Sequence, residues 1–200
     1  LIYETDLYNK FWWFVKEMKD IKTVSRCCKS VHGHYQLIWP MSDREVPILG
    51  YAVDGLDEDN CVVLFFRELY ETDKDLEGNQ IRIPPKIPKA VRINMTIAGM
   101  KFVPVGRHET RMTMVCNIDP KISHIAPPLI NWATRSVFRF SLRILEVKAN
   151  ELDSMPHKER MRTDPFYIWL EARVEDYLKR NGLDKQERTH DPGRTSFENS

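Results

Sequence analysis

The alternation of apolar and polar residues divides the chain into short strand-like segments and one long helix-like segment. Residues 6–19 carry apolar side chains at helical spacing behind Asp6, a residue type that caps helix N-termini, and therefore predict a helix. Segments with strand character follow at 22–28, 34–39, 45–54, 61–69, 91–105 and 109–117. Residues 70–90 are charged and then proline-rich, which argues against a central strand there.

The longest apolar periodicity lies in the second half of the chain. Pro127 and Pro128 open a helix predicted over 129–149, because proline is favoured in the first helical turn. Its apolar stripe consists of Ile130, Ala133, Val137, Phe140 and Ile144. A stripe this broad predicts that the helix lies across a sheet. The pattern as a whole predicts an antiparallel sheet closed by a C-terminal helix, an α+β fold.

The chain changes character after this helix. Pro156 marks a break, and a second short helix is predicted from its N-cap, Asp164, to just before Gly182. Its apolar stripe favours packing against the same domain, with docking of another protein as the alternative. The tail has almost no apolar residues and predicts disorder. Three regions result: 1–150, 151–182 and 183–200.

Composition adds limits to this picture. The 200 residues are 42% hydrophobic and 30% charged, as in globular proteins, and the formal net charge of +1 gives no basic field for nucleic acid. No apolar run approaches the length of a transmembrane helix. The chain begins at Leu1, which suggests excision from a longer protein. The four cysteines lack zinc-site spacing, so neither a metal nor a cofactor is expected, and a reducing, cytoplasmic location is the default.

Three segments together resemble a known family. They are Trp39-Pro40-Met41-Ser42-Asp43-Arg44-Glu45-Val46, Met114-Val115-Cys116-Asn117-Ile118-Asp119-Pro120-Lys121 and Pro127-Pro128-Leu129-Ile130-Asn131-Trp132-Ala133. They resemble, in the same order, motifs of the steroidogenic-acute-regulatory-related lipid transfer (START) domains. Within that family the run Leu-Ile-Asn-Trp-Ala is most similar to phosphatidylcholine transfer protein. The resemblance spans about 1–149 and lacks the helix and strands with which START domains begin, so either these were cut away or the resemblance is to a shortened relative. If they are absent from the working protein, one sheet edge is unpaired.

The resemblance implies a helix-grip fold, in which a curved antiparallel sheet wraps the long helix around a lipid-sized cavity. It also implies a carrier that binds one lipid and contacts membranes transiently. Residues suited to such a site are Arg44, Tyr35, Trp39, Tyr51, Arg92, Asn94, Thr96, Trp132, Val137 and Phe140. Arg44 suits a phosphate, with a structural ion pair as the alternative. Arg92, Asn94 and Thr96 form the polar side of one strand, which either lines the cavity or faces solvent. The aromatic residues Tyr35, Trp39 and Tyr51 either contact the lipid or belong to the core.

The ligand class and the functional class stay open at this level. The sterol-binding branch has an arginine in the strand that corresponds to 46–53, and this chain has none there, so the resemblance favours phospholipid over sterol. A lipid-sensing adaptor module is the main alternative to a carrier. The wider helix-grip superfamily also includes cyclases and hydrolases, but the chain has no nucleophile elbow, zinc-protease motif or phosphate loop. The prediction is therefore a non-enzyme.

Overall fold

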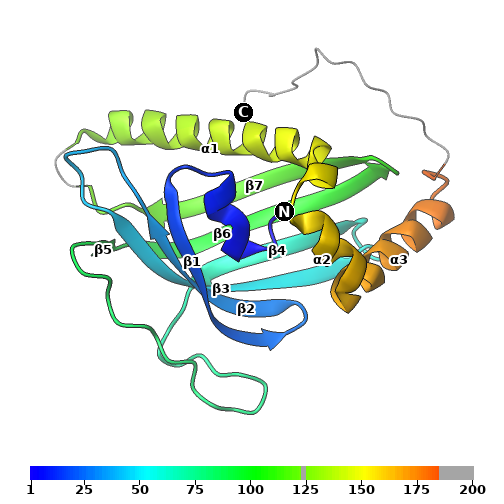
Figure 1. Ribbon diagram of the computed structural model, residues 1–200, viewed down its shortest axis with the longest axis horizontal. Helices are drawn as coiled ribbons and strands as arrows, with labels where there is room; N and C mark the ends of the chain where they lie inside the picture. The colour runs from blue at the N-terminus through cyan, green and yellow to red at the C-terminus, as the bar shows by residue number, and fades with distance from the viewer. Residues whose placement is uncertain (123–124, 185–200) are drawn as a thin grey trace.

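The computed structural model describes residues 1–122 and 125–184 and forms one antiparallel sheet with helices around it (Figure 1). The elements are η1 (Thr5–Lys10), β1 (Val15–Ser25), β2 (Cys28–Tyr35), β3 (Arg44–Gly55), β4 (Cys61–Glu68), β5 (Val91–Arg92), β6 (Asn94–Gly106), β7 (Glu109–Asp119), α1 (Pro127–Asn150), η2 (Leu152–Ser154), α2 (His157–Thr163) and α3 (Pro165–Arg180). The strand order is β1-β2-β3-β4-β6-β7, and the short β5 pairs in parallel with β3.

The strand register separates the sheet into two faces. We call one the inner face; it includes Val31, Val46, Ile48, Phe66, Ala98 and Cys116. The outer face includes Tyr51, Val53, Phe65, Ile97 and Val115. The main core cluster lies on the inner face, and α1 joins it through Leu145, which is buried, and Ile144, which is half-buried. Helix α1 therefore contacts the inner-face core through its second half, and the sheet with this C-terminal helix has the predicted α+β arrangement.

The two C-terminal helices lie at the opposite end of the molecule from the start of α1 (Figure 1). Helix α3 buries Tyr177 and Leu178 against Leu56, in the turn between β3 and β4. Helix α2 places Arg160 in ion pairs with Glu4 and Asp6 of the N-terminal segment. The predicted stripe on the last helix is thus used within the chain, and Asp164 caps that helix by accepting a hydrogen bond from the Phe166 backbone N–H (2.8 Å).

The helix predicted over 6–19 is wrong. Only Thr5–Lys10 is helical, as a 3-10 turn, and β1 begins at Val15. The apolar positions fit both a helix and a strand with irregular register, and pairing with β2 decides in favour of the strand. Asp6 does not act as the cap; it pairs with Arg160 at 2.8 Å and 2.7 Å.

The remaining strand and helix predictions differ from the structure mainly at the ends of the elements. The strand predicted at 22–28 overlaps the end of β1, but the one predicted at 34–39 is mostly wrong, since β2 occupies Cys28–Tyr35 and residues 36–39 form no strand. The strand predicted at 91–105 is divided in the structure, since β5 ends at Arg92 and β6 begins at Asn94. Helix α2 was not predicted at all. The tail predicted to be disordered lies, from 185 onward, outside the described residues.

Candidate functional site

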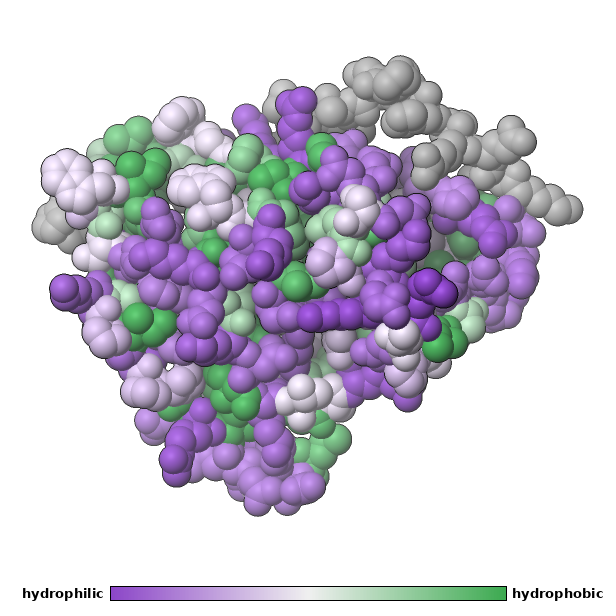
Figure 2. Space-filling view, in the orientation of Figure 1, coloured by the Kyte–Doolittle hydropathy of each residue, from purple (hydrophilic) through white to green (hydrophobic). Residues whose placement is uncertain are grey.

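The space between α1 and the inner face has incompletely buried apolar walls. On α1, Val137 is 46% exposed and Phe140 47%, and both lie on the side of the helix that carries Ile144. On the inner face, Met100, Met112 and Met114 of β6 and β7 are only half-buried. Figure 2 shows apolar surface along the margin where α1 lies. Apolar residues left open on two facing elements are typical of a binding groove, and flexible methionines adapt such a wall to different ligands.

Two polar groups of the inner core have hydrogen-bonding capacity to spare. The indole N–H of Trp12 is buried and has no hydrogen-bond partner among the described residues. Tyr35, which packs at the edge of the same cluster, makes no hydrogen bond through its hydroxyl within the described part of the chain. Burial raises the pKa of Tyr35 to about 12, so its hydroxyl remains a neutral donor at physiological pH. A buried donor without a partner, such as the Trp12 N–H, suits a bound polar group or water.

Arg44 lies at the end of the sheet where β7 leads into α1. Its guanidinium donates to the backbone carbonyl oxygens of Ser42 and Pro120, the latter at 2.7 Å, and of Lys121 at 3.4 Å. The side chain is buried, and burial lowers its pKa from the usual value. These bonds join β3 to the end of β7. The guanidinium of Arg44 is therefore bound by main-chain carbonyl oxygens. It neither forms the ion pair that was the alternative in the sequence analysis nor faces an open ligand site.

Arg92 is part of a buried cluster behind the sheet. Its Nε donates to Oε1 of Glu45 at 2.7 Å, and His32 contacts the other oxygen of this fully buried carboxylate. Burial alone raises the pKa of Glu45, but the hydrogen bonds from Arg92 and His32 outweigh it and hold the pKa below its usual value. The β3–β5 register places Arg92 beside Glu45, on the side of the outer face. The structure therefore does not bring Arg92 to the groove.

The other predicted site residues lie apart from one another. Tyr51 is on the outer face and stacks on Phe65, with ring centroids 5.4 Å apart. Asn94 is exposed and donates to Glu68 at 3.0 Å, and Thr96 is exposed at a register shift in β6. Trp39 is 89% exposed in the loop between β2 and β3. Of the ten predicted residues, Tyr35 packs against the inner core, and Val137 and Phe140 lie on the side of α1 that carries Ile144, whereas Trp132 lies on another side of that helix.

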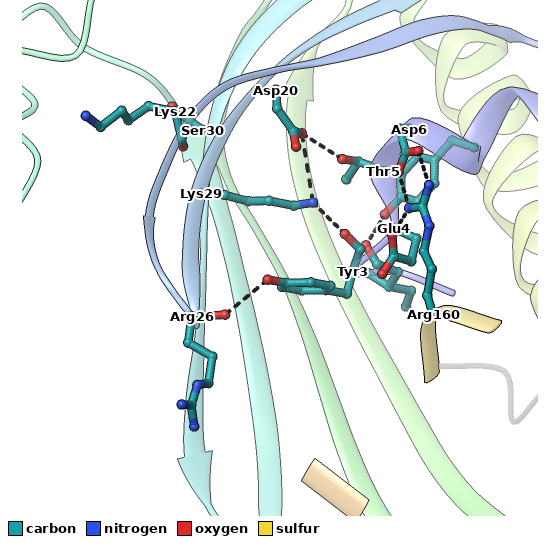
Figure 3. Close-up of polar contacts among 12 residues, drawn as sticks. Tyr3, Glu4, Thr5, Asp6, Asp20, Lys22, Arg26, Lys29, Ser30 and Arg160 are labelled. Carbon is teal, nitrogen blue, oxygen red and sulfur yellow. Dashed lines mark hydrogen bonds and ion pairs between the residues drawn. The ribbon is translucent and has the colours of Figure 1, made fainter. Parts of the chain in front are cut away.

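A second concave region lies away from this groove. It is an open polar pocket of about 610 Å³ between the N-terminal segment, the β1–β2 hairpin and the helices α2 and α3 (Figure 3). Its lining residues are Tyr3, Glu4, Asp6, Asp20, Thr23, Lys29, Arg160, Thr163 and Asp164. Most of the charges are paired internally: Lys29 donates to the Tyr3 carbonyl oxygen at 2.6 Å, and Arg160 to Asp6. The pocket is a junction that holds the C-terminal helices in place.

The N-terminal end of α1 carries exposed aromatic and basic side chains. Arg135, Arg139 and Arg143 are exposed, recur every fourth residue along one side of the helix, and form no ion pair within the described part of the chain. The start of α1 and the β2–β3 loop, which bears Ile38 and Trp39, lie at the same end of the molecule (Figure 1). Sequence analysis overlooked the arginine row, although its spacing is readable. No helix of the described residues is long and apolar enough to cross a membrane.

No protein-family model matches the chain, and no curated protein is recognisably similar in sequence. Human STARD10 has a similar structure, with a TM-score of 0.67 at 14% identity over 85% of this chain and 64% of that chain.

Two further structures match less well. The human StarD13 (DLC2) lipid transfer and protein localization domain gives a TM-score of 0.47 at 15% identity, over 60% of this chain and 54% of that one. A fragment of a STAR-related lipid transfer protein from Xanthomonas axonopodis gives 0.41 at 13% identity, over 58% of both chains. The chain thus spans less than two thirds of the length of these proteins. Its sheet order, its covering helix and the match to STARD10 identify the fold as the α+β helix-grip fold of START domains.

Proposed function

We propose that this chain binds one lipid between α1 and the inner face of the sheet. The observation that supports this most directly is the incomplete burial of Val137 and Phe140 on one wall and of the methionines on the other. An acyl chain would remove this apolar surface from water, at about 25 cal/mol per Å². The fold shared with STARD10 supports the same function, since START domains are named for lipid transfer.

The lipid is proposed to be a phospholipid, with Tyr35 and Trp12 as hydrogen-bond donors to its polar part. The Trp12 N–H is buried without a partner in the described part of the chain, and the half-buried Tyr35 packs against the same cluster. A lipid with ester carbonyl and phosphate oxygens offers several acceptors to such donors. Arg44 is a weaker candidate for phosphate binding, because its bonds to Pro120 and Lys121 would first have to break.

Exchange of the lipid is proposed to occur at a membrane, through the N-terminal end of α1. Trp132 and Trp39 suit the interfacial region of a bilayer, where indole rings are favoured. The row of Arg135, Arg139 and Arg143 suits an anionic lipid surface. This makes the protein a non-enzymatic carrier; the adaptor alternative predicts bound lipid without transfer between vesicles.

Native mass spectrometry of the purified protein, followed by extraction of bound lipid, tests the proposal. We expect one phospholipid per chain. Val137→Lys places a charge against the lipid and should lower occupancy at least about tenfold, since burying an unpaired charge is unfavourable. Val53→Lys is the matched control: Val53 is 47% exposed, like Val137, but lies on the outer face and should keep full occupancy. A chain that is empty in all preparations would remove the carrier proposal.

Membrane contact is tested separately by sedimentation with phosphatidylserine-containing vesicles. Replacing Arg135, Arg139 and Arg143 by Gln should weaken binding by about 1 kcal/mol for each arginine at the surface. The control replaces Arg82, Lys86 and Lys89 in the proline-rich loop by Gln, which removes the same charge from exposed positions elsewhere. Equal losses in both variants would indicate a general charge effect instead of docking by α1.

A further inference from the structure

The loop between β4 and β5 contains a short proline-rich segment. Its sequence is Arg82-Ile83-Pro84-Pro85-Lys86-Ile87-Pro88-Lys89. Residues 82–90 are all described, and they form neither helix nor strand. Proline fixes its own φ and forces the residue before it into an extended conformation. Three prolines in five residues therefore favour a polyproline II helix from 83 to 88.

Exposure along this segment repeats every third residue. A polyproline II helix has about three residues per turn, so side chains three positions apart lie along the same edge. One edge is exposed and consists of Arg82, Pro85 and Pro88. The edge formed by Pro84 and Ile87 is half-buried. The segment therefore lies on the domain along one edge and presents another edge to solvent.

The segment is held in place by the rest of the domain. Ile81 and Ala90, at its two ends, are both buried. Between them, the Pro84 carbonyl oxygen accepts a hydrogen bond from Nη2 of Arg92 at 2.9 Å. Arg92 is itself fixed by its bond to the buried Glu45. A binding segment that is already ordered loses less conformational freedom when a partner binds.

The exposed surface of the segment carries positive charge only. Arg82, Lys86 and Lys89 are exposed, and residues 81–91 include no acidic residue. Within the described part of the chain, none of these three cations forms an ion pair. A partner with acidic side chains beside a proline-binding groove would complement this surface.

We propose that residues 82–89 are a docking segment for a protein domain of the SH3 type. Such domains bind segments with the spacing Pro-x-x-Pro in an aromatic-lined groove, and Pro85 and Pro88 supply this spacing on the exposed edge. Arg82 continues the same edge and suits a carboxylate at the end of the groove. The loop that bears the segment lies on the opposite side of the sheet from α1 (Figure 1). The proposal therefore does not depend on lipid binding.

Binding of the whole chain to an array of purified SH3 domains tests the proposal, with purified WW domains on the same array for comparison. We expect binding to SH3 domains that carry acidic side chains beside the groove. The double variant Pro85→Ala with Pro88→Ala should weaken this binding at least about tenfold, because it removes the ring contacts and the stiffness of the exposed edge. Pro156→Ala is the matched control: it removes an exposed proline before α2 and should bind like the wild type.

Charge reversal tests the role of the arginine by isothermal titration calorimetry with the SH3 domains selected on the array. Arg82→Glu places a carboxylate against the acidic side of the groove and should raise the Kd at least about tenfold. Lys101→Glu is the matched control, since Lys101 is exposed on β6, and it should leave the Kd unchanged. Added salt should weaken binding of the wild type more than binding of Arg82→Glu. Thermal denaturation confirms that the variants are folded.

Three results would overturn the proposal. One is a wild-type chain that binds no SH3 domain on the array, which would leave the segment a purely structural loop. Another is binding to WW domains alone, because a groove of different chemistry would then recognise the prolines. The last is equal binding by the wild type and the double proline variant, which would place the contact elsewhere on the chain.

Discussion

Helices α1 and α3 are both amphipathic and both begin with proline, yet they are held very differently. Helix α3 has a capping side chain in Asp164, buries Tyr177 and Leu178, and pairs Arg173 with Asp54 at 2.7 Å. Helix α1 has no capping side chain, and within it the main core cluster includes only Leu145 and Ile144 among the described side chains. The shorter helix is an anchor, whereas most of the longer one is free to move or to bind.

The largest expected contrast comes from one substitution made in both helices. Leu178→Ala removes a fully packed side chain and should lower the free energy of unfolding by about 2–5 kcal/mol. Leu129→Ala changes a side chain that is 53% exposed and should cost less than about 1 kcal/mol. Urea denaturation followed by circular dichroism measures both. Similar losses would show that α1 is packed as firmly as α3.

Because only α3 has a capping side chain, substitutions at the two caps should change stability in opposite directions, and by less than the substitutions above. Asp164→Ala removes the bond to the Phe166 N–H and should lower stability by about 1 kcal/mol. Ala126→Asp supplies the cap that α1 lacks and should stabilise its first turn by a few tenths of a kcal/mol. Thermal denaturation gives the first value, and hydrogen exchange in the first turns of α1 gives the second. If Ala126→Asp left this exchange unchanged, the start of α1 would already be fixed.

The free energy of unfolding should depend on pH because of a histidine in α2. His157 begins α2, is 1% exposed, and has no hydrogen-bond partner for either ring nitrogen in the described part of the chain. Burial lowers its pKa from the ordinary value of 6.5, so the folded state favours the neutral ring. The contribution of neutral His157 to the free energy of unfolding is therefore fully present above pH 6.5, and it is lost as the pH falls below that value and through the lowered pKa of the folded state. Unfolding free energies at pH 7.5 and about pH 5.5 should therefore differ.

Substitutions of histidine isolate the source of this pH dependence. His157→Leu should abolish most of the difference between the two pH values, whereas His108→Leu, in the exposed turn before β7, should preserve it. Glu45 does not interfere in this range, because its pKa is held below 4.5 and its contribution is lost only at lower pH. An unchanged pH profile in His157→Leu would assign the effect to another group.

The sequence predicted the elements in which local pattern and tertiary contacts agree. β3, β4 and α3 were located to within about a residue at most ends, because turn residues and the Asp164 cap define them locally. The segment 6–19 was misassigned because its apolar spacing fits two structures, and only pairing with β2 distinguishes them. Long-range pairing of this kind is not encoded in any short window of sequence.

The candidate site was predictable only in part for a similar reason. Val137 and Phe140 were found because their periodicity is local. The spare donor of Trp12 was missed, since an unpaired N–H is a property of the folded core. Arg44 and Arg92 were chosen for their chemistry, but the carbonyls of 120 and 121 and the carboxylate of Glu45 reach them from distant positions in the sequence.

The bonds from Arg44 to Pro120 and Lys121 have a consequence for the kinetics of the protein. They fix the chain just before the segment that leads into α1, while Leu145 fixes the helix near its end. The part of α1 before Ile144 adds no side chain to the main core cluster, so we expect its opening to be a local event with a free energy well below that of global unfolding. We therefore expect the rate of lipid exchange and the rate of unfolding to respond to different substitutions, so that each can change in evolution without the other.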